Sequence, residues 1–238
     1  MNHPFFRFPH TPHIAWQGEG APRDDKVLAA NEIRALLAGE VVVEEKLDGA
    51  NLGFSVGPDG KLRAQNRGQY LTAPYAGQFR RLPEWLDVHG TALADALGEH
   101  LITFGEWCAA RHSLDYTALP DWWLCFDVYD RHEQRFWSTR RRDALATKLG
   151  LATVPCIERG PQTLESLKAM VTHGRSRYRD GGFEGIVVRQ EDADWLLARG
   201  KLVHGRFVQS IGKHWRKRAL QWNQVAYEGN ARFDNLAG

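Results

Sequence analysis

Two predicted β-strands flank the stretch Glu45-Lys46-Leu47-Asp48-Gly49-Ala50-Asn51, around which the chain is organised. The β-branched run 41–43 precedes it and the alternating run 52–56 follows it, so we expect Lys46 at a strand end beside a turn. Burial among apolar strands lowers the pKa of a lysine and makes its amine nucleophilic. The alternative is an exposed lysine beside an Asp-Gly hairpin turn, and for so short a motif alone this alternative is favoured.

The composition is that of an ordinary globular protein. The chain has 238 residues, 43% of them hydrophobic, which is enough for the core of one large domain or two small ones. The formal net charge is only +2, so affinity for a polyanion has to come from local clusters of basic residues. One cluster near the C-terminus contains no Asp or Glu and suits a phosphate backbone, although a solvated basic helix is the alternative. Its members are Arg199, Lys201, Arg206, Lys213, Arg216, Lys217 and Arg218.

The cysteines and the N-terminal region bear on the cellular compartment. Cys108, Cys125 and Cys156 are widely spaced and form no CxxC pair, so we interpret them as buried thiols in a reducing cytoplasm. The N-terminal region lacks the apolar core of a signal peptide, and no run reaches the ~18 apolar residues that span a bilayer. We therefore expect a cytoplasmic protein without membrane contact.

The helix and strand signals predict an α+β architecture of antiparallel strands and helices. Residues 3–16 are expected to form an extended segment whose aromatic side chains pack on the body. The strands on either side of the Lys46 stretch and the next strand are expected to form an antiparallel meander. The first expected helix begins at Asp24 or Asp25 and runs to about residue 37. Three further helices are expected over 89–99, 139–149 and 164–173, and a last one from residue 208 to about 224. The expected strands cover 41–46, 51–56, 61–66, 101–107, 122–130, 183–189 and 201–208.

Several of these strands contain a charged residue inside or just beside an apolar run, where an unpaired polar group is costly. Each one taken singly is also compatible with a satisfied structural residue or one that faces solvent. Their order along the chain is more informative than any one of them. The residues are Glu106, Asp127, Asp130, Glu184 and Lys201.

Six ordered elements resemble the covalent nucleotidyltransferases, the superfamily of ATP-dependent DNA ligases, RNA ligases and mRNA capping enzymes. The elements are KLDGAN (46–51), QNRG (65–68), FGEW (104–107), FDVYD (126–130), EGIVVR (184–189) and KLV (201–203). The form of these elements is most similar to the compact ATP-dependent RNA ligase family. The resemblance implies an antiparallel-sheet nucleotidyltransferase (ATP-grasp-like ligase adenylation) domain with flanking helices, in which 1–238 is one domain and 208–238 a basic C-terminal helical tail.

The resemblance assigns a role to each matched residue. Lys46 would attack the α-phosphorus of ATP as a neutral amine and carry AMP as a lysyl-AMP. Glu106 would accept a hydrogen bond from a ribose hydroxyl, and Phe126 would stack on adenine. Glu184 would help to bind Mg²⁺ or Mn²⁺, and Lys201 would neutralise charge on the α-phosphate.

The resemblance also implies two larger sets of residues. The nucleotide-binding set is Glu45, Lys46, Leu47, Asp48, Asn51, Arg67, Glu106, Phe126, Glu184 and Lys201. The nucleic-acid-binding set is Arg67, Arg206, Lys213, Arg216, Lys217 and Arg218. The sequence departs from the family near Lys201, where the family commonly has two lysines spaced KxK. Here the pair is either Lys201 followed by Val203 or Arg199 followed by Lys201, and in the second case an arginine, which is not equivalent to a lysine, stands first.

We therefore expect an ATP-dependent RNA ligase that joins 3'-hydroxyl and 5'-phosphate ends. Its partner is expected to be RNA, with a nicked duplex or an RNA/DNA hybrid as candidate forms and the choice among nick, gap and single-stranded ends open. An end-healing kinase or phosphatase is a candidate partner. A minimal DNA nick ligase shares the adenylylation chemistry and stays open as an alternative. A capping guanylyltransferase fits less well, because little of the chain is left for an oligonucleotide-binding domain. A catalytically inactive nucleic-acid-binding module is disfavoured, because it has no use for the acidic pair.

Overall fold

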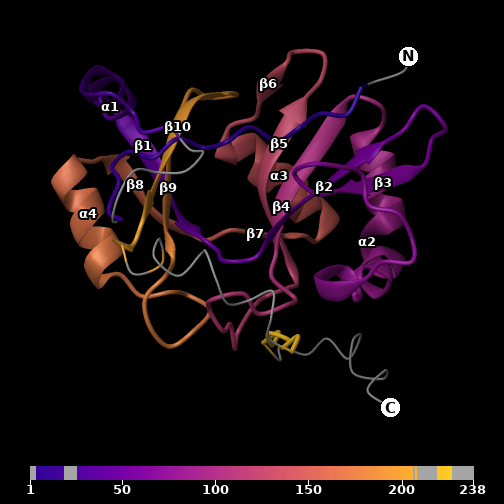
Figure 1. The fold of residues 1–238 in the computed structure, drawn as a ribbon. Helices are drawn as coiled ribbons and strands as arrows, with labels where there is room; N and C mark the ends of the chain where they lie inside the picture. Colours follow the sequence, from indigo (N-terminus) through magenta and orange to yellow (C-terminus); the bar gives the residue numbers. More distant parts are fainter. Residues whose placement is uncertain (1–3, 19–25, 206, 208–218, 227–238) are drawn as a thin grey trace.

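The computed structural model describes residues 4–18, 26–205, 207 and 219–226 of the chain. Two sheets lie side by side, and helices pack against each of them (Figure 1). One sheet has four strands in the order β10-β9-β1-β8, and the other has the path β3-β2-β4-β5-β6 with β7 beside β5. All neighbouring strands are antiparallel except β5 and β7, so the expected α+β class is confirmed.

The four-stranded sheet is built around β1, which pairs with β8 on one side and β9 on the other. Its β-branched residues Val41 and Val43 are buried with Ile186 and Val188 of β9, as expected for a strand with both faces covered. The elements of this half are α1 (Ala30–Leu36), β1 (Glu40–Lys46), β8 (Cys156–Pro161), α4 (Leu164–His173), β9 (Gly185–Glu191) and β10 (Leu196–Val203).

The six-stranded sheet has an aromatic core. Phe54 of β2 stacks on Trp85 of α2 with ring centroids 5.1 Å apart, and Trp123 of β5 packs against both rings. Such rings bury large apolar areas and fix α2 on the sheet. The elements of this half are β2 (Ala50–Val56), β3 (Leu62–Gln65), η1 (Gly77–Phe79), α2 (Leu82–Leu97), β4 (Leu101–Trp107), β5 (Trp123–Asp130), β6 (Arg135–Phe136), α3 (Thr139–Leu149) and β7 (Ala152–Thr153).

The expected meander of three strands is wrong at its first connection. β1 belongs to the four-stranded sheet and β2 to the six-stranded sheet, so residues 47–49 cross from one sheet to the other. The crossing is held by Leu47, which is buried in a separate apolar cluster, and by Asp48, whose Oδ2 accepts hydrogen bonds from two backbone amides of a distant loop. Only the second connection, between β2 and β3, is the expected hairpin.

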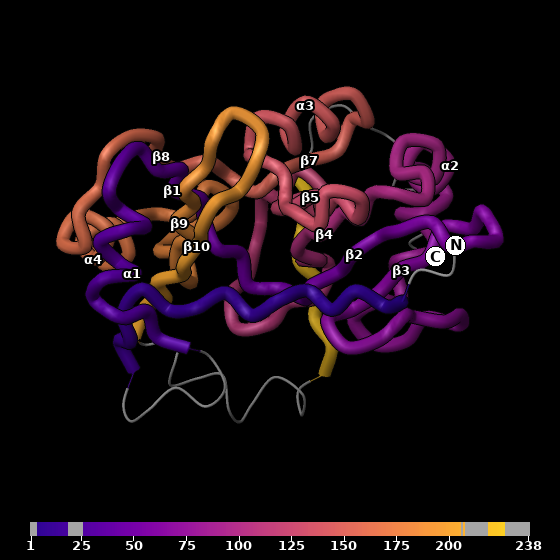
Figure 2. Tube along the Cα trace, turned by 90° about the horizontal axis from the view of Figure 1, so that it is seen from above, coloured from indigo at the N-terminus to yellow at the C-terminus, as the bar shows by residue number. Residues whose placement is uncertain are grey.

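The N-terminal strap, residues 4–16, runs in extended form across both sheets (Figure 2). Phe6 stacks on Tyr129 of β5 with a centroid distance of 3.9 Å, and Phe8 lies 4.8 Å from the ring of Phe104 in β4. Further along, the amide of Ile14 donates to the carbonyl of Lys201 in β10 at 2.8 Å. The expectation that this segment packs its aromatic side chains on the body is confirmed for the described residues.

The helix boundaries agree with the sequence where a capping side chain is present. Ser138 and Thr163 cap α3 and α4, and both helices have the expected ends. In contrast, α1 begins only at Ala30, because Glu32 bonds back to the Ala29 amide at 2.8 Å; Asp24 and Asp25 lie outside the described residues. Helix α2 begins at Leu82, before the expected start, with a proline in its first turn.

The C-terminal stretch 219–226 is extended, so the expected helix to about residue 224 is wrong for this part of the chain. Trp222 bridges to Ala110, and the side chain of Asn223 bonds to the Tyr116 amide at 2.9 Å and to the Cys108 carbonyl at 2.7 Å. These bonds satisfy an extended backbone that runs beside another loop. The predicted nucleic-acid contacts in the tail lie outside the described residues; they are Arg206, Lys213, Arg216, Lys217 and Arg218.

Two further sequence expectations concern cysteines and membrane spans. Cys108 and Cys125 are buried as expected, but Cys156 is exposed, because it lies on β8 at the edge of its sheet. Among the described residues, no helix is long and apolar enough to cross a membrane.

Candidate active site

A pocket of about 380 Å³ opens between the two sheets, a volume typical of small-molecule sites. Its walls come from β1, β2, β4, β5, β9, β10 and the N-terminal strap. Most of the predicted nucleotide-binding residues meet here. Those that line the pocket are Glu45, Lys46, Leu47, Asn51, Arg67, Glu106, Phe126 and Lys201.

Lys46 ends β1 and places its amine beside two carboxylates. Its Nζ donates to Glu184 Oε2 at 2.6 Å, and its side chain is 26% exposed. Burial by itself lowers the pKa of Lys46, but the charges of Glu184, Glu106 and Asp48 outweigh it and raise the pKa to about 12. The expectation of a lowered lysine pKa is therefore wrong for this arrangement, because the sequence does not show which carboxylates surround the amine.

Glu106 and Glu184 both have raised pKa values. Burial raises the pKa of Glu106 to about 7; Lys46 opposes this rise and Glu184 adds to it. Burial also raises the pKa of Glu184, against the influence of Lys46. Glu106 Oε1 accepts a hydrogen bond from the Gly49 amide at 3.0 Å, which ties the crossing segment to β4. Carboxylates held this way favour a cation nearby.

Phe126 forms an aromatic wall of the pocket. The ring of Phe8 from the N-terminal strap lies 5.3 Å from it. The carbonyl of Phe126 accepts hydrogen bonds from Arg142 at 2.9 Å and from Arg189 at 3.3 Å. These two buried arginines hold the backbone in place, and the ring is only half-buried, so it presents a fixed face to a planar ligand.

Glu44 Oε1 lines the pocket in an ion pair with Arg142 Nη1 at 2.7 Å. Two other buried polar atoms of the pocket have no hydrogen-bond partner among the described residues. They are Oδ1 of Asn51 and Nε of Arg67. A buried donor or acceptor without a partner is destabilising, so both atoms are suited to hydrogen bonds with a ligand. The pocket therefore fits a ligand that is polar as well as planar.

The basic residues of β10 play different parts. Lys201 lines the pocket. Burial raises the pKa of Glu184, and the charge of Lys201 is among the influences that lower it, so Lys201 lies near this carboxylate. Arg199 bonds to Asp127 Oδ2, and its guanidinium carbon lies 4.6 Å from the ring centroids of Phe8 and Phe136. Lys201 is thus a cation of the pocket, while the charge of Arg199 is balanced by Asp127.

Three predicted residues have positions that differ from simple ligand contact. Asp48 and Glu184 do not line the pocket wall formed by the described residues, although Glu184 binds the Lys46 amine. The carboxylate of Glu45 accepts hydrogen bonds from Ser176 Oγ and from the Arg177 amide. Asp48 and Glu45 therefore hold the chain on either side of Lys46 in place.

The strands that form the pocket are also the part of the sequence that matches a known protein family. The model of the RNA ligase family matches residues 39–203, from the start of β1 to the end of β10. This chain belongs to the RNA ligase family. The match includes every strand that contributes to the pocket, and the N-terminal strap lies before it.

Solved structures have the same fold as this RNA ligase family member. A mutant of Naegleria gruberi RNA ligase with ATP and Mn has a TM-score of 0.65 at 17% identity, over 88% of this chain and 59% of that one. The same enzyme with PPi gives 0.62 at 17% identity, over 86% and 64%. An Aquifex aeolicus protein described as an ATP-dependent DNA ligase gives 0.54 at 21% identity, over 84% and 50%. This chain thus spans less than two thirds of the length of each of these proteins. A comparison with curated proteins found no match.

The fit of a divalent cation in this RNA ligase family member follows from its donor set. The described residues contain no group of three or more His, Cys, Asp or Glu side chains placed to hold a metal. Mg²⁺ commonly uses only one or two carboxylates and shares the rest of its shell between waters and substrate phosphates. Glu184 fits that kind of binding, in which the nucleotide would complete the site.

Sequence reasoning missed several residues of the pocket. Phe8 and Thr11 come from the strap, and the aromatic content of that segment signalled packing but not a pocket wall. Glu44 and Arg189 also line the pocket; each is a fully buried charge in a β-branched strand, which is a recognisable signal because such charges need partners. Asp127, already singled out as a polar residue, binds Arg189 Nη1 at 2.8 Å.

Proposed function

We propose that this chain is an ATP-dependent RNA ligase that joins 3'-hydroxyl and 5'-phosphate ends through a lysyl-AMP on Lys46 and an adenylylated 5' end. The observation that carries the proposal is the position of the Lys46 amine, 2.6 Å from Glu184, at a pocket with an aromatic wall. Membership of the RNA ligase family supports the choice of RNA.

The first step requires Lys46 to lose a proton. Its raised pKa keeps the amine protonated at neutral pH, so a nearby base has to accept that proton before attack. Glu184 is in hydrogen-bond contact, and its own raised pKa suits it to this role. A divalent cation bound at the carboxylates would supply further stabilisation of the neutral amine and of phosphate charge.

The three transfers proceed on one site. The Lys46 amine attacks the α-phosphorus of ATP, the new P–N bond forms, and the bond to the leaving pyrophosphate breaks. An oxygen of the RNA 5'-phosphate then attacks the same phosphorus, which breaks the P–N bond and returns the amine. The RNA 3'-hydroxyl finally attacks the 5'-phosphate, loses its proton and releases AMP.

The walls of the pocket match the parts of the nucleotide. We assign the adenine to the face of Phe126, and a ribose hydroxyl to Glu106, whose carboxylate accepts hydrogen bonds. The unpaired Arg67 Nε and Asn51 Oδ1 are available for sugar or phosphate groups. Lys201 would neutralise the α-phosphate during each transfer.

Labelling with α-labelled ATP and Mg²⁺ or Mn²⁺ tests this function. Wild-type protein should gain an acid-stable label, and Lys46→Ala should lose it completely, because the proposed P–N bond forms on the Lys46 amine. Lys201→Ala serves as a partial-loss variant, and GTP in place of ATP tests base choice. A wild-type protein without label, or an equal label in Lys46→Ala, would refute the proposal.

The physiological substrate and setting are finer parts of the same proposal. We favour RNA ends, as single strands, a nicked duplex or an RNA/DNA hybrid, in RNA repair, with an end-healing kinase or phosphatase as partner. The two buried, unpaired thiols support a reducing cytoplasm. We also retain 1–238 as one domain with a basic tail over 208–238 that contacts RNA phosphates. Sealing of matched RNA and DNA nicks distinguishes this enzyme from a DNA ligase, since preference for the all-DNA nick would favour the latter.

A further inference from the structure

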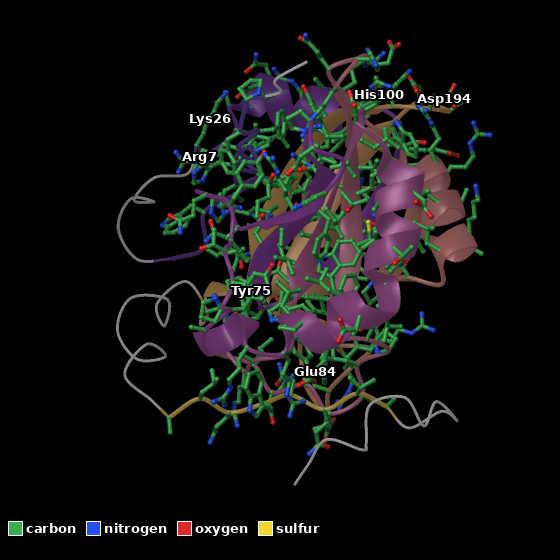
Figure 3. All side chains as sticks on the ribbon, turned by 90° about the vertical axis from the view of Figure 1, so that its right-hand side faces the viewer. Arg7, Lys26, Tyr75, Glu84, His100 and Asp194 are labelled. Atoms are coloured by element: carbon green, nitrogen blue, oxygen red, sulfur yellow. The ribbon has the colours of Figure 1, made fainter. Side chains whose placement is uncertain are left out.

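A second pocket, of about 390 Å³, lies away from the nucleotide pocket. It is formed where the C-terminal stretch meets two loops of the six-stranded half, and we call it the end pocket: residues 76–79, 110–112 and 219–221. Figure 3 labels Tyr75 and Glu84 at this end of the molecule, where the described C-terminal stretch runs, and His100 and Asp194 at the opposite end. None of the residues to which we assign a role in the proposed reaction lines this pocket.

Arginine and tryptophan side chains come directly after two stretches that line the pocket: Arg80 and Arg81 follow Phe79, and Trp222 follows Gln221. We call these three residues, with the lining residue Arg111, the rim. The guanidinium carbons of Arg80 and Arg81 lie 5.6 and 4.6 Å from the ring centroid of Trp222. Arg111 is exposed at the same rim, and its amide donates to the Gln221 carbonyl at 2.8 Å. Basic groups arranged on an aromatic platform are the combination that binds single-stranded nucleic acid, because phosphates and base faces are both recognised.

Polar groups with fixed positions line the interior. His112 Nε2 lies 2.6 Å from Gln78 Oε1, and the carbonyl of Gln78 accepts a hydrogen bond from Trp107 Nε1 at 2.7 Å. The side chain of Leu220, at the mouth of the pocket, is 40% exposed. An amide and an imidazole next to an apolar side chain suit the edge and the face of a nucleobase, whereas an acidic peptide would use only the rim.

The end pocket is connected to the catalytic lysine by a short loop. Directly after His112, the amides of Ser113 and Leu114 both donate to Asp48 Oδ2 at 2.7 Å. Burial lowers the pKa of His112, and the charges of Asp48 and Lys46 act on it as well, so the imidazole is near both. A nucleotide in this pocket would lie close to the ends that are joined.

The side of the rim formed by Trp222 is held firmly. Asn223 is buried, and its side chain bonds to the Tyr116 amide, the Cys108 carbonyl and the Ala110 carbonyl. The backbone of the neighbouring Trp222 is therefore held in place. A ligand that stacks on this rim loses little binding free energy to the ordering of the protein.

We propose that the end pocket binds an unpaired nucleotide of the RNA, with the base inside and the flanking phosphates on Arg80, Arg81 and Arg111. This proposal rests on the proposed ligase function and adds to it a second contact with the substrate. It requires that binding of RNA depends on this rim, while charging of Lys46 with AMP takes place in the other pocket.

Binding of a 5'-phosphorylated 12-nucleotide RNA tests the rim. Arg80→Glu and Arg111→Glu should each weaken binding by about tenfold, because a phosphate contact is replaced by repulsion. Arg34→Glu is the matched control: it makes the same change in net charge on exposed α1 of the other sheet, and should change the affinity less than about twofold. In the milder variant Arg80→Ala, the slope of log K against log salt should fall by about 0.7, the value for one phosphate of a single strand.

The interior is tested with the same RNA carrying one abasic residue, moved along the strand. In wild-type protein, binding should be weakest when the abasic residue takes the place of the base that enters the end pocket. In Gln78→Leu, the affinity should no longer depend on the position of the abasic residue. If Arg80→Glu and Arg111→Glu bind RNA like Arg34→Glu while all variants are labelled by ATP, the end pocket is not a nucleotide site. If no variant and no wild-type protein is labelled but the rim variants still lose RNA, the ligase function fails and the nucleotide site remains.

Discussion

Arg199 lines the pocket while its charge is balanced within the protein. Its guanidinium lies between the rings of Phe8 and Phe136, at 4.6 Å from each centroid, and bonds to Asp127. A planar guanidinium makes both interactions at once, which a compact ammonium cannot. The arginine that replaces a lysine in the family pattern therefore has a local structural explanation.

We predict that Arg199→Lys lowers stability but retains the label. Losing the stacking on two rings should reduce the free energy of unfolding by about 1 to 2 kcal/mol, because each cation–π contact at a desolvated position contributes about 1 kcal/mol. Urea unfolding and labelling with saturating α-labelled ATP measure the two effects. Lys201→Ala is the comparison, and should lose most of the label with little change in stability. A stable Arg199→Lys protein without label would instead make Arg199 a phosphate contact.

The pKa of Lys46 depends on carboxylates from distant parts of the chain. A strand end rich in β-branched residues predicted burial, and burial alone does lower the pKa of this lysine. The direction of the net shift depends on Glu184, which lies 138 positions later in the chain and pairs across β1 and β9. The ordered motifs thus predicted residues that line one pocket, but not the protonation state of the amine.

At the scale of elements, the N-terminal strap lies before the family match and contacts strands of both sheets. It contributes Phe8 and Thr11 to the nucleotide pocket and pairs with the backbone of Lys201 through Pro12 and Ile14. Capping side chains, Ser138 for α3 and Thr163 for α4, made these two helices predictable, and Gly150 marks the end of α3. The strands β7 and β8 were not predicted, because β7 has two residues and β8 is an exposed edge strand with charged side chains.

Helix α2 is docked by a mostly buried carboxyl that should make stability depend on pH. Asp121 Oδ1 accepts a hydrogen bond from Trp85 Nε1 at 2.9 Å, and His89 Nε2 lies 3.5 Å from Oδ2. Burial raises the pKa of Asp121 to about 6, against the influence of the Trp85 hydrogen bond. The folded protein holds this proton more tightly than the unfolded chain, so its stabilising effect is complete below pH ~4 and is lost as the pH rises through about 6.

Asp121→Asn should remove this dependence. The shift of about two units corresponds to about 3 kcal/mol, so the variant should gain about 2 kcal/mol relative to wild type between pH 4.5 and 7.5. Its amide oxygen can still accept from Trp85. Unfolding in urea at both pH values measures the difference, and Asp95→Asn, on an exposed position of the same helix, is the control. An equal pH dependence in wild type and Asp121→Asn would contradict the prediction.

At the scale of the whole molecule, buried charges connect the two sheets. Arg189 of β9 bonds to Asp127 of β5 at 2.8 Å and to Glu191 at 2.6 Å, and lies 3.8 Å from Glu44 of β1. The arginine and its partner Glu44 are almost fully buried. The sequence indicated a charge in each strand, but not that the sheets are separate, because the crossing at 47–49 has the residues of an Asp-Gly turn. The relation between the halves therefore had to come from the structure.

Arg189→Met should loosen this connection and separate the unfolding of the two halves. Removing one member of a buried ion network costs about 3 kcal/mol, the lower end of the usual range, because Asp127 and Glu44 keep Arg199 and Arg142 as partners but lose the arginine between them. Fluorescence mainly follows the buried tryptophans of the six-stranded half, Trp85, Trp107 and Trp123, whereas far-UV circular dichroism follows both halves. In wild type the two urea transitions should coincide; in Arg189→Met the dichroism transition should begin at lower urea. Arg140→Met, which breaks an exposed pair with Asp194, should leave both transitions coincident and nearly unmoved, because surface pairs contribute little. Coincident transitions in Arg189→Met, at any midpoint, would show that apolar packing alone joins the sheets.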